Sequence, residues 1–139
     1  MWRTFTVDEK GNELTLQGSM EGWWAGDLYS FLTEEPSQFH IEAMEECELL
    51  LITKSSWDIL LNKVPAFERY FRILIQNSLI ATQRRLMSSM SESAEEKYTK
   101  LINNFPGCLQ RIPQHMVASY LGITPETLSR IRGQMSERK

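Results

Sequence analysis

Three side chains near the C-terminal end, Glu126, Ser129 and Arg130, have the types and the spacing to contact the edges of base pairs. Ser129 and Arg130 follow Glu126 by three and four residues, so all three share one face of a helix expected at residues 125–136. A carboxylate can accept a hydrogen bond from cytosine N4, and an arginine can bind guanine O6 and N7 together. The trio is therefore a candidate for base-specific contact with DNA.

The residues before this trio predict a pair of helices that would position it. Pro113 can open a first helix and Gly122 can end it in the left-handed conformation, while Thr124 can cap a second helix that begins at Pro125. Ala118 lies where the two helices would cross, and its small side chain permits a close approach. This spacing is typical of a DNA-binding helix-turn-helix, although a plain helical hairpin with solvated charges is the alternative.

Polar side chains around the trio are candidates for contacts to the DNA backbone, which position a protein without reading sequence. They are Gln114, Thr124, Thr127 and Arg132.

The net charge of −3 conceals an uneven distribution. Residues 1–50 contain 2 basic and 11 acidic side chains, a net charge of −9, whereas residues 51–100 and 101–139 each carry +3. The basic surplus therefore lies in the two segments that would carry the long helix and the candidate DNA contacts.

A long helix is expected at residues 66–90, where neither glycine nor proline occurs. Its apolar side chains form two stripes, one containing Phe67 and Phe71 and the other containing Ile73, Ile80 and Met87. Two stripes on one helix indicate two packing partners, of which one would be a second copy of the chain. A single broad core face is the alternative.

The N-terminal part has the alternation typical of short strands. Residues 4–7 and 13–17 flank a polar turn and predict a hairpin, and residues 39–43 and 48–52 are further strand candidates. A short helix is expected at 57–63 with Ser55 or Ser56 as its cap, and Ser93 with Glu96 predicts a capping box for a helix that ends near Asn104.

Residues 118–131, with the sequence ASYLGITPETLSRI, closely resemble the helix-turn-helix of Crp/Fnr-type bacterial transcription regulators. Residues 22–28, GWWAGDL, resemble the entry to the phosphate-binding cassette in the cyclic-nucleotide-binding-like β-roll of that family. The long helix at 66–90 falls where the family has its dimerising helix. The resemblance covers essentially the whole chain in the right order.

The resemblance implies a cytoplasmic bacterial homodimer that binds double-stranded DNA at a pseudo-palindromic operator. The family's base-reading roles carry over to Glu126, Ser129 and Arg130. RNA polymerase and an unidentified small effector are further implied partners. The alternative is a dimerisation or effector-sensing module whose DNA binding is vestigial or absent.

The effector cassette departs from the family pattern. Its residues here would be Gly26, Asp27, Leu28, Ser37 and Gln38. Ser37 and Gln38 stand where the family has an arginine followed by serine or threonine, and no basic residue lies between Lys10 and Lys54. A cyclic phosphate would meet a negative field without a cationic partner, so we expect no response to cyclic AMP.

Other classes of site lack the residues they need. Two dispersed cysteines, Cys47 and Cys108, cannot supply the four thiolates of the iron–sulfur cluster found in the redox branch of the family, and we expect no metal or other cofactor. No catalytic motif and no membrane-spanning run occurs, so neither an enzyme nor a membrane protein is expected.

The sequence thus predicts an α+β protein in three parts. These are an incomplete antiparallel β-roll at residues 1–64, a dimerisation helix and hinge at 65–91, and a helix-turn-helix domain at 92–139. The family's leading strands and its C-terminal wing would both be missing.

Overall fold

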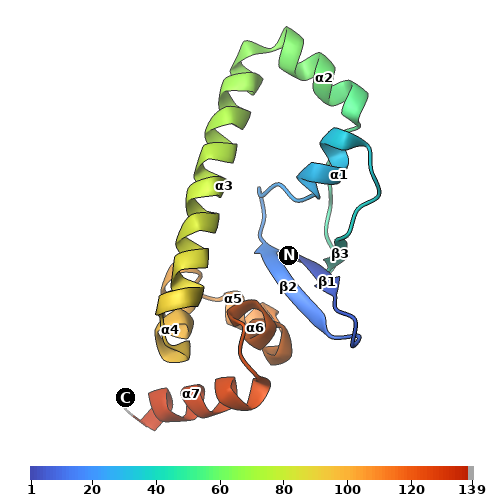
Figure 1. Ribbon diagram of the computed structural model, residues 1–139. Coiled ribbons are helices and arrows are strands. Elements are labelled where there is room, and N and C mark those ends of the chain that lie inside the picture. The colour runs from blue at the N-terminus through green and yellow to red at the C-terminus, as the bar shows by residue number, and fades with distance from the viewer. Residues whose placement is uncertain (138–139) are drawn as a thin grey trace. The chain divides into compact units, whose positions relative to one another are not determined.

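The structure is a computed structural model that describes residues 1–137, apart from the side chain of Cys108. It is a mixed α+β fold with three strands and seven helices in the described range (Figure 1). In chain order these are β1 (Trp2–Val7), β2 (Glu13–Ser19), α1 (Leu28–Thr33), β3 (His40–Ala43), α2 (Lys54–Lys63), α3 (Pro65–Ser91), α4 (Ala94–Asn104), α5 (Cys108–Arg111), α6 (Gln114–Leu121) and α7 (Pro125–Glu137).

The chain divides into two compact units. The first contains residues 1–47 together with the chain from Glu92 onwards, and the second contains residues 48–91. The sheet and the C-terminal helices therefore belong to one unit, which we call the sheet–head unit, and α2 and α3 form the other.

The three strands form an antiparallel sheet in the order β2-β1-β3. The predicted hairpin is confirmed, and Asp8 closes its turn by accepting hydrogen bonds from the backbone N–H groups of Lys10 and Asn12. The buried guanidinium of Arg3 in β1 pairs with Glu13 of β2 at 2.6 Å and with Glu42 of β3 at 2.7 Å. One side chain on the central strand thus ties both neighbours to it.

The prediction of a strand at residues 48–52 is wrong. The segment has no regular structure, and the side chains of Leu50 and Leu51 are 104% and 91% exposed. A strand needs a neighbour to take up its backbone hydrogen bonds, and in the described part of the chain no fourth strand lies beside β3. An apolar run without such a neighbour does not form a strand.

The second unit consists of α2 packed against the start of α3. The indole of Trp57 is buried, with its ring centroid 5.2 Å from that of Phe67 and 4.3 Å from that of Phe71. The predicted cap of α2 is wrong, because Thr53 rather than Ser55 or Ser56 accepts the hydrogen bond from a first-turn N–H. The helix accordingly begins three residues earlier than expected.

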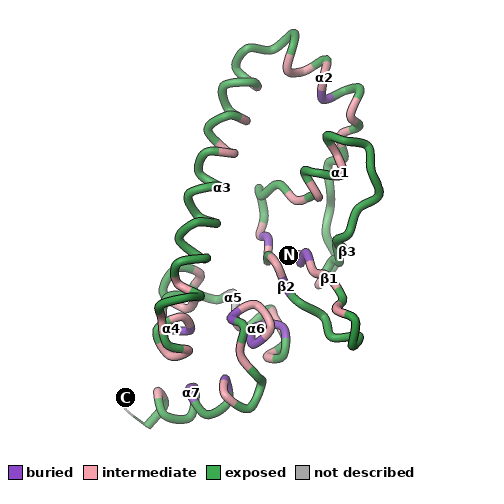
Figure 2. The backbone as a smooth tube through the Cα atoms, in the orientation of Figure 1, coloured by how far each residue is buried: buried purple, intermediate pink, exposed green. Residues whose placement is uncertain are grey.

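The long helix is confirmed as α3, but none of its residues is buried. The stripe of Phe67 and Phe71 meets Trp57, whereas the stripe of Ile73, Ile80, Met87 and Met90 is 43%, 46%, 62% and 77% exposed. Figure 2 shows that exposed residues predominate along α3.

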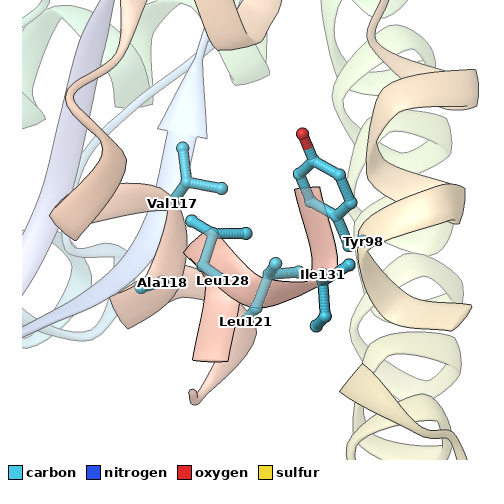
Figure 3. Close-up of a cluster of buried hydrophobic side chains, with 6 residues drawn as sticks. All are labelled: Tyr98, Val117, Ala118, Leu121, Leu128 and Ile131. Carbon is cyan, nitrogen blue, oxygen red and sulfur yellow. The ribbon is translucent and has the colours of Figure 1, made fainter. Parts of the chain in front are cut away.

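The C-terminal helices α4, α6 and α7, which we call the head, surround a buried apolar cluster. Its members, drawn in Figure 3, are Tyr98, Val117, Ala118, Leu121, Leu128 and Ile131. The predicted capping box of α4 is present, with Ser93 and Glu96 each accepting a backbone hydrogen bond from the other. Lys97 of α4 donates to the carbonyl of Leu121 at 3.0 Å and so satisfies the C-terminal end of α6.

Candidate nucleic-acid interface

A three-residue turn joins α6 to α7, and its geometry follows from two side-chain choices. Gly122 has φ 69° and ψ 36°, a left-handed conformation that glycine adopts without steric cost. Thr124 then caps α7, because its hydroxyl accepts a hydrogen bond from the N–H of Thr127 at 3.2 Å. Pro113 differs slightly from expectation, since it is the cap of α6 and the helix begins at Gln114.

The inner faces of α6 and α7 meet through small and aliphatic side chains. Ala118 and Leu128 are both 0% exposed, and Val117, Leu121 and Ile131 are buried beside them. Ala118 has the small side chain that the sequence predicted for a close crossing. The orientation of α7 is consequently set by the burial of Leu128 and Ile131.

The outer face of α7 carries the three candidate base-reading residues. Glu126, Ser129 and Arg130 are all exposed, on the side of α7 opposite Leu128 and Ile131. The pKa of Glu126 is lowered, first by a hydrogen bond from its own backbone N–H and then by the hydroxyl of Thr124. The carboxylate is therefore ionised at neutral pH and is a hydrogen-bond acceptor.

The four residues that are candidates for contacts to the DNA backbone differ in their exposure. Thr124 and Arg132 are exposed, whereas Gln114 and Thr127 are half-buried. The hydroxyl of Thr127 lies 3.2 Å from that of Thr124, so these two residues form one polar corner at the start of α7. Gln114 stands at the start of α6, and Arg132 lies further along α7.

A contact between α6 and the edge of the sheet was not predicted. The hydroxyl of Ser119 accepts a hydrogen bond from the N–H of Thr15 and donates one to the carbonyl of Glu13, both at 2.9 Å. The edge strand β2 is thereby capped by a helix side chain instead of another strand. No local sequence signal indicates this contact, because its partners are more than 100 positions apart.

A second unpredicted contact joins α5 to the loops after β2 and β3. The guanidinium of Arg111 is 2.6 Å from Glu21 Oε1 and 3.3 Å from Glu21 Oε2, and it also donates to Glu45. Arg111 lowers the pKa of Glu21 from 4.5 to about 2 and also lowers that of Glu45. The charged pair with Glu21 therefore exists at neutral pH and is lost as the pH falls from about 4.5 through about 2.

The expected effector-cassette residues gather around the start of α1. Asp27 caps this helix by accepting from the N–H of Ser30 at 3.2 Å, and Ser37 donates its hydroxyl to Asp27 at 2.9 Å. Desolvation raises the pKa of Asp27, but hydrogen bonds from Ser30, Ser37 and Gln38 outweigh it and hold the pKa below its usual range. Asp27 and Ser37 are thus occupied with each other, and Gly26 and Leu28 flank the cap.

Two further observations concern other classes of site. Among the side chains that the structure describes, which do not include that of Cys108, no group of three or more histidine, cysteine, aspartate or glutamate residues is placed to hold a metal ion. Over the same residues, no helix combines the length and the apolar character needed to cross a membrane.

The chain is similar to a known regulator. Its sequence is 25% identical over 149 aligned residues to regulatory protein HlyX from Actinobacillus pleuropneumoniae. The alignment covers 97% of this chain and 60% of HlyX, so the chain spans about three fifths of that relative's length. No protein-family model matches the chain. The similarity supports a regulatory role at the level of a family.

Proposed function

We propose that this chain is a dimeric, sequence-specific DNA-binding transcription regulator of the Crp/Fnr type that does not respond to cyclic AMP. The observation that carries the proposal is the exposed trio of Glu126, Ser129 and Arg130, opposite the buried side of α7. The similarity to a protein named as a regulator supports the same conclusion.

In this proposal α6 and α7 are a helix-turn-helix and α7 is the recognition helix. Arg130 binds a guanine with two parallel hydrogen bonds, and Glu126 accepts from a cytosine. Ser129 lies between them and contacts a neighbouring base edge. Gln114, Thr124, Thr127 and Arg132 bind phosphates and hold the helix in the major groove.

The proposed homodimer forms through residues 66–90. α3 contains 27 residues and exposes the stripe of Ile73, Ile80, Met87 and Met90. At 1.5 Å per residue such a helix is about 40 Å long, enough for an extended helix–helix interface. The dimer would place two copies of α7 about 34 Å apart, one turn of DNA, on a pseudo-palindromic operator.

The three-stranded sheet is, in this proposal, the remnant of a β-roll whose cassette no longer binds a cyclic nucleotide. Asp27 and Ser37 hydrogen-bond to each other where a phosphate would need donors and a cation. An unidentified small effector and RNA polymerase are further proposed partners, and the protein is proposed to act in the bacterial cytoplasm.

The test compares Arg130→Ala with Arg132→Ala, two arginine truncations on the same helix. Selection from a palindromic DNA library should show that Arg130→Ala loses preference at one base step, while its binding to random-sequence DNA changes little. Arg132→Ala should weaken binding to all sequences. It should also reduce the slope of log K against log salt by the contribution of about one phosphate contact. Equal losses on all sequences for Arg130→Ala would contradict the base-reading role.

The alternative function is a dimerisation or effector-sensing module with vestigial or no DNA binding. The exposed apolar stripe of α3 favours a dimerising role whatever the head binds. Dimers in solution that show no salt-dependent binding to any DNA would support this alternative.

A further inference from the structure

Arg111 stands beside the proposed DNA-binding helices but is held by the acidic half of the chain. It is the last residue of α5 and precedes Gln114, the first residue of α6, by three positions. Its guanidinium donates to both carboxylate oxygens of Glu21 and to one oxygen of Glu45. We call this three-residue arrangement the Arg111 clamp.

The side chain and its location both suit a phosphate contact. A helix N-terminus attracts phosphate, and the first helix of a helix-turn-helix lies across the DNA backbone. An arginine fork binds phosphate and carboxylate with the same bidentate geometry. The two glutamates thus occupy the donors that a phosphate near the start of α6 would use.

We propose that Arg111 is a phosphate-binding residue of the DNA-binding surface that Glu21 and Glu45 withhold, so that the acidic N-terminal half competes with DNA for one guanidinium. This inference rests on the proposed function. It adds a DNA contact that the sequence did not single out. It also gives the acidic half a direct influence on DNA affinity.

The scarcity of cations in the head makes this competition important. The chain from residue 92 to residue 139 contains seven basic side chains, and five of them lie in the described range: Lys97, Lys100, Arg111, Arg130 and Arg132. Three of them are engaged within the protein, since Lys97 donates to the carbonyl of Leu121, Lys100 pairs with Glu92 and Arg111 is in the clamp. Release of Arg111 would therefore add one guanidinium to those of Arg130 and Arg132 in the described range.

The clamp can open without separating the sheet from the head. Ser119 holds the edge of β2 through two hydrogen bonds at 2.9 Å, and the ring of Trp23 meets that of Phe105 edge-on with centroids 6.0 Å apart. These contacts involve none of the clamp residues. Loss of the two carboxylates would consequently free the guanidinium while the sheet stays in place.

The experiment measures DNA affinity as a function of salt for the double variant Glu21→Gln/Glu45→Gln. The matched control is Glu34→Gln/Glu35→Gln, which removes two negative charges from the same half of the chain and leaves the clamp intact. The probe is a random-sequence DNA duplex, because a phosphate contact does not depend on sequence. Protection of the Thr15 amide from hydrogen exchange reports whether β2 stays on Ser119 in every variant.

One new phosphate contact should steepen the slope of log K against log salt by about 0.9, which raises affinity roughly 5- to 10-fold near 0.1 M salt. The control should keep the wild-type slope. Addition of Arg111→Ala to the clamp variant should return its slope to that of the wild type.

The remaining outcomes separate the two proposals. Equal slopes for the clamp variant and the control, with DNA binding otherwise intact, would overturn this inference and leave the proposed function standing. Absence of salt-dependent binding in the wild type and in every variant would overturn the proposed function and this inference with it.

Discussion

The head and the long helix α3 are both helical and rich in apolar side chains, yet they bury them very differently. In the head, six residues from α4, α6 and α7 form a buried cluster, and Leu128 is 0% exposed. In α3, the longest helix, no residue is buried. The head thus provides its own packing partners, whereas α3 has an apolar stripe that still requires one.

The difference shows that an apolar pattern predicts a helix and a face but not the partner of that face. The cluster of the head forms because short connections let its helices pack against one another. Beyond Phe67 and Phe71, α3 extends away from the short helix α2 that covers its beginning. The stripe centred on Ile80 is therefore where we place the proposed dimer interface.

The largest expected effect on stability comes from a cavity created in the head. Leu128→Ala should lower the free energy of unfolding by about 3 kcal/mol, because it removes a fully buried side chain and leaves a void. Urea unfolding measures this loss. Leu79→Ala in α3 is the control, since Leu79 is 58% exposed, and it should cost much less. Similar losses for the two variants would show that α3 is packed as tightly as the head.

The next effect concerns the dimer. Ile80→Glu places a charge in the exposed stripe of α3 and should raise the dimer dissociation constant at least about 30-fold, because an ionised carboxylate opposes burial in an apolar interface. Sedimentation equilibrium measures the constant. Thr82→Glu adds the same charge on the side of α3 opposite Ile80 and should leave the constant nearly unchanged. Equal effects of the two substitutions would exclude the stripe as the interface.

The smallest effects concern the contact of β2 with α6, where one substitution should stabilise the protein and another should destabilise it. The hydroxyl of Thr15 is buried without a hydrogen-bond partner, so Thr15→Val should raise the free energy of unfolding by about 1 kcal/mol. Ser119→Ala should lower it by about 1 kcal/mol, since two hydrogen bonds are lost. Thermal unfolding of both variants measures these two changes in the free energy of unfolding. A decrease for Thr15→Val as well as for Ser119→Ala would contradict the environment described for Thr15.

Most of the features that depend on neighbouring residues were predictable, although the cap of α2 at Thr53 was not. The left-handed Gly122, the cap at Thr124 and the capping box of Ser93 with Glu96 each satisfy backbone groups within a few positions. The hairpin of β1 and β2 belongs to the same class, because a polar turn brings its two strands together. The exposed face of α7 followed from helical periodicity alone.

Features that depend on a distant partner were missed or predicted wrongly. Residues 48–52 have the composition of a strand, but a strand also needs a neighbouring edge. Arg111 looks like any basic residue until the loops after β2 and β3 bring Glu21 and Glu45 to it. Ser119 likewise looks like a solvated helix residue until the edge of β2 meets its hydroxyl.

The local sequence therefore specified the long helix α3, the caps of α4 and α7 and the side chains presented by α7, because these depend on interactions within a few residues. The tertiary structure determined which charges are occupied and which are exposed. The acidic surplus of residues 1–50 is visible in the composition, but only the fold brings two of those carboxylates to an arginine at the base of the head. The physical reason is that ion pairs and sheet edges are completed by residues that the chain brings together from far apart.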